Sequence, residues 1–325
     1  MLKRVALSQN QTGDQRLAGL LTASAAKAGE DVYPLRNIAA FVLEDGQTRF
    51  AGLGADEHTE FEIASVTKTF TADLLEQAIE LGEATPDTTV HDVLGERVRG
   101  AAVSTVTLAE LANHTSGLPR MGKQRLSSRV RAVLGLNPDV GITVDDVVDQ
   151  ALAARLEGRG AETYSNLAHD LLGLLLAEVA GTRYPELIKQ RVLDPLGMTE
   201  TYVALPGTVG PGKRGGGGVS MLGWRVQAWE MDGTAPSGGL RSTTCDMAKY
   251  AAYVLERDKF RFTWPNIKGT ELYWHNGGTF GFSSMLLLDT GKQRASFVAA
   301  DSSTEIEPFA FELLGLEDPA KNKKQ

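Results

Sequence analysis

Apolar residues recur at helical spacing in three long stretches of this chain. Over residues 14–28, leucines and alanines stand three or four positions apart, and the same spacing returns over 65–81 and 167–180. An apolar residue at every third or fourth position places all of them on one face of an α-helix. The pattern therefore predicts three amphipathic helices, each with one face buried.

Strand-like runs lie near both ends of the sequence. Between residues 37 and 54, two apolar segments flank Asp45-Gly46, a dipeptide typical of a tight β-hairpin turn. Late in the chain, the runs "SSMLLLD" (283–289) and "RASFVAAD" (294–301) are separated by a short polar turn. We therefore predict one hairpin near the N-terminus and a pair of strands near the C-terminus.

The order of these elements predicts the fold class. A helix and a hairpin come first, a long helical block follows from about residue 62 to 200, and strands return before a closing helix over 304–315. This order favours an α+β fold, in which an antiparallel sheet is flanked by the N- and C-terminal helices. We expect residues 1–60 and 201–325 to form the sheet domain, residues 61–200 to form an inserted, mainly helical domain, and the active site to lie at their interface.

Composition and charge exclude several classes of protein. Hydrophobic residues make up 42% of the 325 positions, enough for a packed core. The chain has 33 basic and 41 acidic residues and a net charge of −8, which argues against a nucleic-acid or anionic-membrane partner. A polar N-terminal stretch and the lack of a long apolar run predict a cytoplasmic, soluble protein.

Metal and redox chemistry have little support in the sequence. The chain has one cysteine, Cys245, so it can form no intrachain disulfide. The five histidines, at positions 58, 91, 114, 169 and 275, show no paired ligand spacing such as His-x-x-x-His. The string from Gly207 to Lys213 resembles a phosphate-binding loop, but Arg214 follows where Ser or Thr should supply a magnesium ligand. We therefore expect no metal and no cofactor.

Two Ser-x-x-Lys strings are candidates for nucleophilic chemistry. Ser65 and Lys68 stand at the start of a predicted helix, where side chains three apart are neighbours and free backbone N–H groups can stabilise an oxyanion. Ser24 and Lys27 have the same spacing but lie in the middle of a helix, where we expect a solvated face. The position at a helix start favours Ser65 as the nucleophile.

Two further motifs carry groups that acyl-transfer chemistry needs. Tyr164-Ser165-Asn166 precedes a strong helix, so a phenol that can relay protons and an amide that can hold a carbonyl stand on a loop. In His275-Asn276-Gly277, the glycine lies in a probable strand and indicates a close approach to the backbone. Taken singly, each motif also has a purely structural explanation. An exposed Tyr and an Asn that caps the next helix would explain the first motif, and a hydrogen-bonded His beside a bulge would explain the second.

Together the three motifs match the pattern of serine acyl-enzymes. The chain resembles the serine β-lactamase-like and penicillin-binding-protein-like hydrolases, and looks closest to the class C β-lactamase, esterase and D-aminopeptidase branch. Supporting stretches are "ELANHTSGLP" (110–119), "YSNLAHDLLGLLLAEVAGTRYPELIKQRVLDPLGMTETY" (164–202), "APSGGLRSTTCDMAKY" (235–250) and "HNGGTFGFSS" (275–284). The resemblance covers about residues 35 to 302.

The resemblance implies roles for seven residues. Ser65 would be acylated, Lys68 would act as base or electrostatic partner, and Tyr164 would take the proton and activate the acceptor. The substrate would be held by Asn166 and by the segment that contains His275, Gly277 and Gly278, and the N–H groups of Ser65 and Gly278 would form the oxyanion hole.

The substrate and the acceptor stay open in the sequence. His275 stands where the family often has a lysine, and a histidine with an ordinary pKa of about 6.5 is mostly neutral at pH 7. This favours an ester, a D-amino-acid amide or another neutral small-molecule acyl donor over a carboxylate-bearing β-lactam. The alternatives are an acyltransferase that passes the acyl group to an amine or alcohol, and a β-lactamase, DD-peptidase or non-catalytic ligand-binding relative.

Overall fold

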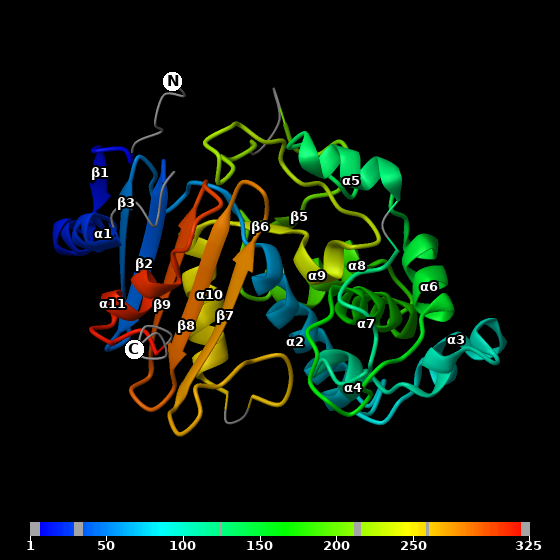
Figure 1. The fold of residues 1–325 in the computed structure, drawn as a ribbon. Helices are drawn as coiled ribbons and strands as arrows, with labels where there is room; N and C mark the ends of the chain where they lie inside the picture. The colour runs from blue at the N-terminus through cyan, green and yellow to red at the C-terminus, as the bar shows by residue number, and fades with distance from the viewer. Residues whose placement is uncertain (1–6, 29–34, 124, 211–215, 258–259, 320–325) are drawn as a thin grey trace.

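The computed structural model describes residues 7–28, 35–123, 125–210, 216–257 and 260–319. The centre of the fold is a six-stranded antiparallel sheet with the order β1-β3-β2-β9-β8-β7 (Figure 1). A three-stranded sheet, β4-β6-β5, lies beside it. The strands are β1 (Gln11–Gly13), β2 (Ile38–Glu44), β3 (Gln47–Leu53), β4 (Phe61–Glu62), β5 (Tyr202–Val203), β6 (Leu240–Ser242), β7 (Leu272–Gly278), β8 (Ser283–Asp289) and β9 (Arg294–Ala300).

Helices surround the large sheet and fill the middle of the chain. Within the described residues they are α1 (Gln15–Ala28), α2 (Thr67–Glu80), α3 (Val90–Leu94), α4 (Leu108–Ala112), α5 (Leu126–Val133), α6 (Val144–Ala153), α7 (Asn166–Val179), α8 (Tyr184–Ile188), α9 (Ala235–Gly238), α10 (Thr244–Leu255) and α11 (Glu307–Leu313). Short 3₁₀ turns include Ala64–Val66, and a π-helical turn, Lys189–Leu193, follows α8.

The sheet is built from both ends of the chain, as the order of elements predicted. β2 pairs with β3 through the hairpin at Asp45-Gly46, where both residues have positive φ, and pairs on its other side with β9. The α+β prediction is therefore confirmed. The predicted division into a 61–200 helical domain and a two-part sheet domain stays a prediction, since α9 packs against α2 and α7 although it lies outside that range.

Alternation along β2 divides the core into two layers. Ile38, Ala40 and Val42 face a cluster that includes residues of α1 and α11, whereas Ala39 and Phe41 face the cluster that includes residues of α2, α7 and α10. Successive side chains of a strand point to opposite faces, so a strand apolar at every position must be covered on both sides. Figure 1 shows α1 and α11 on the outer side of the sheet and α10 on the other side.

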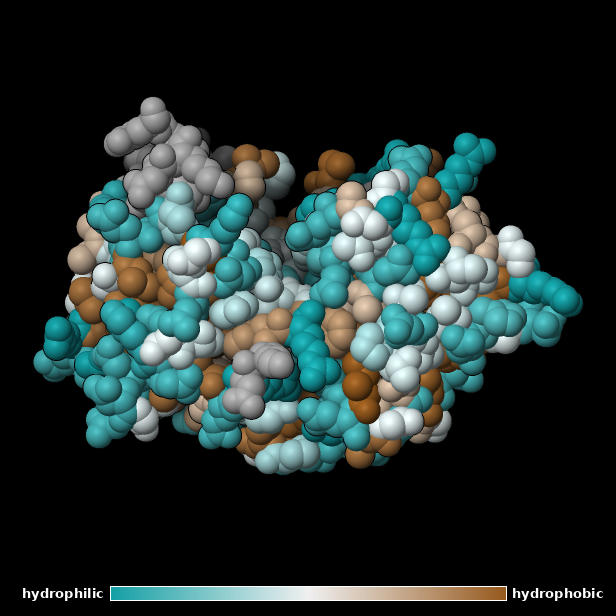
Figure 2. Space-filling model, turned by 90° about the horizontal axis from the view of Figure 1, so that it is seen from below, coloured by the Kyte–Doolittle hydropathy of each residue, from teal (hydrophilic) through white to brown (hydrophobic). Residues whose placement is uncertain are grey.

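Hydrophilic residues predominate on the face of the molecule that is seen from below (Figure 2). In the view from below, apolar residues form only small scattered groups on the visible face (Figure 2). Among the described residues, no helix combines the length and the apolar character that crossing a bilayer requires. Part of the string that resembles a phosphate-binding loop, residues 211–215, lies outside the described residues.

Candidate active site

Ser65 lies in a strained turn at the start of α2. The residue before it, Ala64, has φ +46°, a value that residues with a side chain rarely adopt. The 3₁₀ turn Ala64–Val66 then runs directly into α2 at Thr67. A non-glycine residue in this region persists only where the surrounding structure holds it, and such positions cluster at functional sites. The turn therefore fixes the direction of the Ser65 hydroxyl.

Two side chains reach the Ser65 hydroxyl. Lys68 Nζ donates to Ser65 Oγ at 3.1 Å, and Tyr164 Oη donates to the same oxygen at 2.8 Å. Lys68 Nζ also lies 5.0 Å from the centre of the Tyr164 ring. The structure thus brings together three of the residues to which the sequence pointed, although 99 positions separate Tyr164 from Ser65.

The buried Lys68 is held by the backbone of α9. Its Nζ donates to the Ser237 carbonyl oxygen at 2.6 Å, and the side chain is 0% exposed. The Ser237 N–H in turn donates to Asp170 Oδ1 at 3.0 Å. Asp170 therefore holds the backbone of Ser237, the residue whose carbonyl oxygen accepts from Lys68.

Sequence reasoning missed Asp170 and Ser237. A local signal for Asp170 exists, since His169 and Asp170 are the only polar residues in the stretch 167–177. No local signal marks the Ser237 carbonyl, because a backbone acceptor carries no residue identity.

A pocket of about 390 Å³ opens beside Ser65, and its wall includes Ser65, Tyr164, Asn166 and Gly278. This volume suits a small molecule. Asn166 Oδ1 is buried, and no described residue donates a hydrogen bond to it. A buried acceptor without a donor is costly, so a substrate N–H is a natural partner for it. The helix α7 is capped by Ser165, whose Oγ accepts from the Ala168 N–H, and not by Asn166.

The pocket wall also carries charged residues. Asp139 and Asp170 line it together with Arg120 and Lys123. Burial raises the pKa of Asp139 and raises the pKa of Asp170 well above its ordinary value. The Arg120 guanidinium lies 5.0 Å from the centre of the Tyr164 ring. The pocket therefore presents both hydrogen-bonding carboxyl groups and cations to a ligand.

Gly277 lets β7 approach the Ala64–Val66 turn, which carries Ser65. A Cβ at this position would lie 2.2 Å from Ile63 O and 3.0 Å from Ser65 N, distances too short for real contacts. Ser284 on the neighbouring strand donates to the same Ile63 carbonyl at 2.8 Å. The close backbone approach that the sequence predicted here is present. A Cβ at Gly278, by contrast, would meet no atom within 4 Å.

His275 lies beneath the site and not on the described lining of the pocket. It is 3% exposed, and its Nδ1 contacts the Asn276 carbonyl oxygen at 2.8 Å. Burial, aided by the nearby Lys68 charge, lowers the pKa of His275 to about 3. The ring is therefore neutral at pH 7. Its predicted contact with substrate stays a prediction, which this burial does not favour.

Two more histidines pack behind Tyr164. The His114 ring lies 4.5 Å from both the Tyr164 ring and the His169 ring, and its Nδ1 accepts from the Ser165 N–H at 3.0 Å. Burial lowers the pKa of His114 to about 4, with the Lys68 charge as a second cause. His114, part of the stretch "ELANHTSGLP", therefore packs against Tyr164 and supports its loop through the Ser165 N–H.

The second Ser-x-x-Lys string has no such surroundings. Lys27 extends to the surface and pairs with Glu312 at 2.6 Å, with 65% of its side chain exposed. Ser24 faces the core and is 5% exposed. The expected solvated face is thus correct for Lys27 and wrong for Ser24, because α1 turns the serine toward the sheet.

The fold and the site define a class: an α+β protein in which a serine at a helix start meets a lysine one turn on and a tyrosine from a helical region. The Beta-lactamase family model matches residues 23–280, most of the chain. The chain belongs to the β-lactamase family.

Named relatives show the range of that family. The chain is 32% identical over 146 residues to Penicillin-binding protein 4* of Bacillus subtilis, which covers 44% of this chain and 30% of that protein. It is 31% identical over 208 residues to the D-alanyl-D-alanine-carboxypeptidase/endopeptidase AmpH of Escherichia coli, covering 61% of this chain and 50% of that protein. The chain therefore aligns with half or less of the length of these curated relatives.

Solved structures share the fold over nearly the whole chain. A β-lactamase/D-alanine carboxypeptidase from Pseudomonas syringae superposes with a TM-score of 0.76 at 17% identity, covering 94% of this chain and 100% of that one. A class C β-lactamase from Rhodobacter sphaeroides gives 0.72 at 18% identity, covering 93% and 99%. At such identity the likeness shows the fold alone.

Proposed function

We propose that this chain is a serine hydrolase that forms a covalent acyl-enzyme on Ser65 from a small-molecule ester or amide. One observation carries the proposal: Lys68 Nζ and Tyr164 Oη both lie within hydrogen-bond distance of Ser65 Oγ, at 3.1 and 2.8 Å, at the wall of a pocket. A serine hydroxyl needs a neighbouring base to become a nucleophile at neutral pH. The family membership of the chain supports the same chemistry.

The proposed reaction has two halves. Ser65 Oγ attacks the carbonyl carbon, and its proton passes to whichever of Lys68 and Tyr164 has lost its own proton in the reactive form of the site. The bond to the leaving alcohol or amine breaks, and the departing group takes that proton. Water then attacks the acyl-serine and gives a proton to the same base. The base passes this proton to Ser65 Oγ as the bond from the acyl carbon to Oγ breaks, which releases a carboxylic acid and free Ser65. The N–H groups of Ser65 and Gly278 would hold the oxyanion in both halves.

The charges around the pocket support a neutral acyl donor. The fixed cation that a lysine on β7 would provide is missing, because the buried His275 is neutral at pH 7. Any substrate carboxylate would be bound by Arg120 or Lys123 instead. The unpartnered Asn166 Oδ1 suits an amide N–H of the acyl donor. We therefore propose esters and amides without an essential carboxylate as the substrates.

Labelling with a fluorophosphonate probe tests the nucleophile. We expect mass spectrometry to find the probe on the peptide that contains Ser65, and Ser65→Ala to abolish labelling while the protein stays folded by circular dichroism. Label on Ser24 or Ser116 with Ser65 unmodified would overturn the assignment. A panel of p-nitrophenyl esters, D-amino-acid amides and cephalosporins, assayed with and without an added amine, then identifies the acyl donor and the acceptor.

A further inference from the structure

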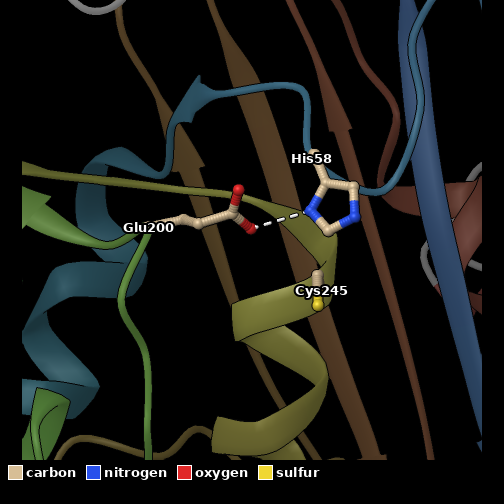
Figure 3. Close-up of side chains that lie close together, drawn as sticks. All are labelled: His58, Glu200 and Cys245. Carbon is tan, nitrogen blue, oxygen red and sulfur yellow. Dashed lines mark hydrogen bonds and ion pairs between the residues drawn. The ribbon is translucent and has the colours of Figure 1, made fainter.

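Three residues with metal-ligand chemistry meet away from the pocket. His58 Nδ1 lies 3.0 Å from Glu200 Oε2. One ring nitrogen of His58, one carboxylate oxygen of Glu200 and Cys245 Sγ all lie within 4.8 Å of one another. Figure 3 shows the imidazole, the carboxylate and the thiol gathered beside the first turn of α10. They come from three distant segments, so no local spacing in the sequence reveals the group.

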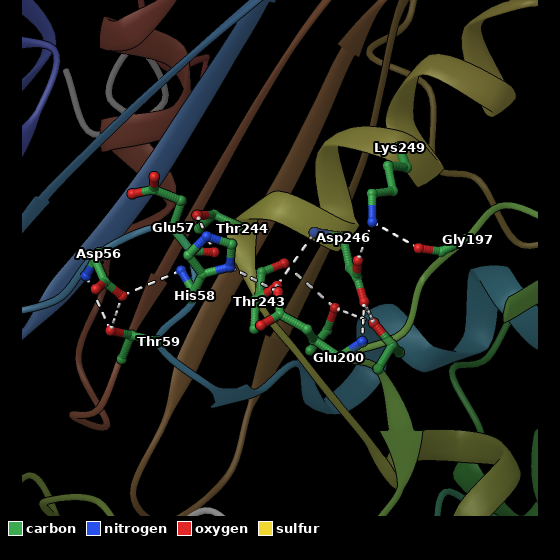
Figure 4. A network of polar contacts seen from close by, with 12 residues as sticks. Asp56, Glu57, His58, Thr59, Gly197, Glu200, Thr243, Thr244, Asp246 and Lys249 are labelled. Atoms are coloured by element: carbon green, nitrogen blue, oxygen red, sulfur yellow. Dashed lines mark hydrogen bonds and ion pairs between the residues drawn. The ribbon is translucent and has the colours of Figure 1, made fainter.

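Backbone hydrogen bonds tie these three segments to one another. The Cys245 N–H donates to the Glu57 carbonyl, next to His58, at 3.0 Å. The Glu200 N–H donates to Asp246 Oδ2, next to Cys245, at 2.8 Å. Figure 4 shows this network around the start of α10. The backbones of the three residues are therefore held in place by the fold itself, and only side-chain rotations remain to be adjusted.

Support for the carboxylate comes from a second residue. Thr243 Oγ1 donates to Glu200 Oε2 at 3.2 Å, the same oxygen that faces His58. Hydrogen bonds of this kind orient metal-ligating carboxylates in known sites. The Glu200 side chain thus already points toward the other two residues.

The local charge favours a cation. Asp246, Glu200 and Glu57 place negative charge near the Cys245 thiol, and Lys249 places a positive charge there. Lys249 Nζ is itself engaged by Asp246 Oδ1 and the Gly197 carbonyl, at 2.7 Å each. A divalent ion would relieve the repulsion among these acidic groups and hold the thiol as a thiolate.

The geometry is close to that of a metal site. In a tetrahedral zinc site, with bonds of about 2.0–2.3 Å, ligand atoms are about 3.3–3.8 Å apart. The ligand atoms of His58, Glu200 and Cys245 lie up to 4.8 Å apart, so one or two of these side chains would have to move by about 1 Å to bind the ion. The His58 side chain is 59% exposed, so it is free to rotate and solvent ions can reach it.

We propose that His58, Glu200 and Cys245 bind Zn²⁺ through nitrogen, oxygen and sulfur, with a solvent molecule as the fourth ligand. Thiolate, imidazole and carboxylate together suit zinc better than magnesium or calcium, which prefer oxygen ligands alone. The ion would join the 54–60 loop that leads to β4, the turn before β5, and α10. None of the three residues is on the described lining of the pocket, so the site is separate from the proposed hydrolysis.

Cobalt and zinc binding to chelator-treated protein test the proposal. We expect one Co²⁺ per chain, with thiolate-to-cobalt charge-transfer absorption that Cys245→Ser abolishes. His58→Ala and Glu200→Gln should weaken Zn²⁺ binding at least about tenfold, the scale on which even second-shell changes act. Because Cys245 is the single cysteine, its reaction with a thiol reagent reports this site alone, and Zn²⁺ should slow that reaction.

Controls separate the site from adventitious binding and from catalysis. His91→Ala removes an exposed histidine elsewhere and should leave zinc affinity and thiol protection unchanged. Zinc should raise the melting temperature of the wild type and not that of Cys245→Ser. Binding that is indifferent to Cys245→Ser and His58→Ala, or no cobalt charge-transfer band, would show that the group is only a His58–Glu200 ion pair. Fluorophosphonate labelling of Ser65 should proceed without metal, so the two proposals can fail independently.

Discussion

The ammonium group of Lys68 is buried but hydrogen-bonded to Ser65 Oγ and to the Ser237 carbonyl. A charged side chain is stable in the interior only when its donors are used. Burial is the first cause of the lowered pKa of both His114 and His275, and the Lys68 charge is the second. At the scale of single residues, Lys68 therefore adds to an effect that burial dominates.

Removal of either proposed proton-transfer group should slow turnover with the fold intact. We expect Lys68→Ala and Tyr164→Phe each to lower kcat by about 10²–10⁴-fold, the usual contribution of general acid–base catalysis. Lys27→Ala is the matched control, since it removes the lysine of the other Ser-x-x-Lys string and should leave the rate unchanged. Wild-type turnover in Tyr164→Phe or Lys68→Ala would refute the role of that residue.

At the scale of elements, the site depends on how closely β7 packs against the Ala64–Val66 turn. The strand reaches the turn because Gly277 has no side chain, and Ser284 of β8 adds a hydrogen bond to Ile63 O. The other wall of the site is formed by the loop that carries Tyr164 and by the start of α7. The start of α2, the end of β7 and the loop that carries Tyr164 thus meet around Ser65 Oγ.

A methyl group at Gly277 should displace the Ala64–Val66 turn, which carries Ser65. In Gly277→Ala, the new Cβ would collide with Ile63 O and Ser65 N, and overpacking of this kind costs about 1–3 kcal/mol of stability. We expect kcat/KM to fall at least about 100-fold, the scale on which a misplacement of 1 Å acts. Steady-state kinetics and thermal unfolding measure both effects.

Gly278→Ala is the matched comparison on the same strand. Its Cβ would meet open space, and its backbone N–H would be kept. We expect near-wild-type stability in this variant. Equal loss of stability in the two variants would contradict the role assigned to Gly277.

At the scale of the whole molecule, burial places several neutral imidazole rings between the helices and the sheet. His114, His169 and His275 are each buried, and burial is the first cause of the lowered pKa of each. Each of these residues binds a proton more readily in the unfolded chain than in the fold. Above pH 6.5 these histidines do not lower the free energy of unfolding. As the pH falls from 6.5 toward their folded pKa values, the unfolded chain binds protons that the fold does not, and the free energy of unfolding decreases.

His275→Asn isolates one part of this effect. The folded pKa of His275 is about 3, so the wild type should lose stability relative to the variant between pH 6.5 and 4.5. One pH unit corresponds to about 1.4 kcal/mol, which gives a relative loss of about 2 kcal/mol. Urea unfolding at several pH values measures the difference. Asp73, whose burial raises its pKa to about 6, titrates in the opposite sense in both proteins and cancels in the comparison.

A constant difference across this pH range would contradict the buried, neutral state of His275. His91→Asn controls for the loss of a histidine as such, since His91 is exposed on α3. If His275→Asn and His91→Asn change the pH dependence of the free energy of unfolding equally, the burial of His275 has no effect on that dependence.

Local pattern alone predicted much of the fold and part of the site. Apolar runs beside turn residues located the strands, and the spacing of Ser65 and Lys68 predicted their contact, since residues three apart on a helix are neighbours. Tyr164 was found through its loop position and the family resemblance. Neither signal predicts that Asp170 holds the Ser237 backbone to which Lys68 donates, or that His275 is buried. Both features depend on how distant elements pack.

The sequence by itself determined the long helices, the strands near both chain ends and the family that the chain resembles, because these follow from spacing and residue type along the chain. The tertiary structure decided which of two Ser-x-x-Lys strings meets a tyrosine, and which histidine lies beside the only cysteine. Such meetings arise when segments about a hundred or more residues apart pack together, and no periodicity along the chain records that distance.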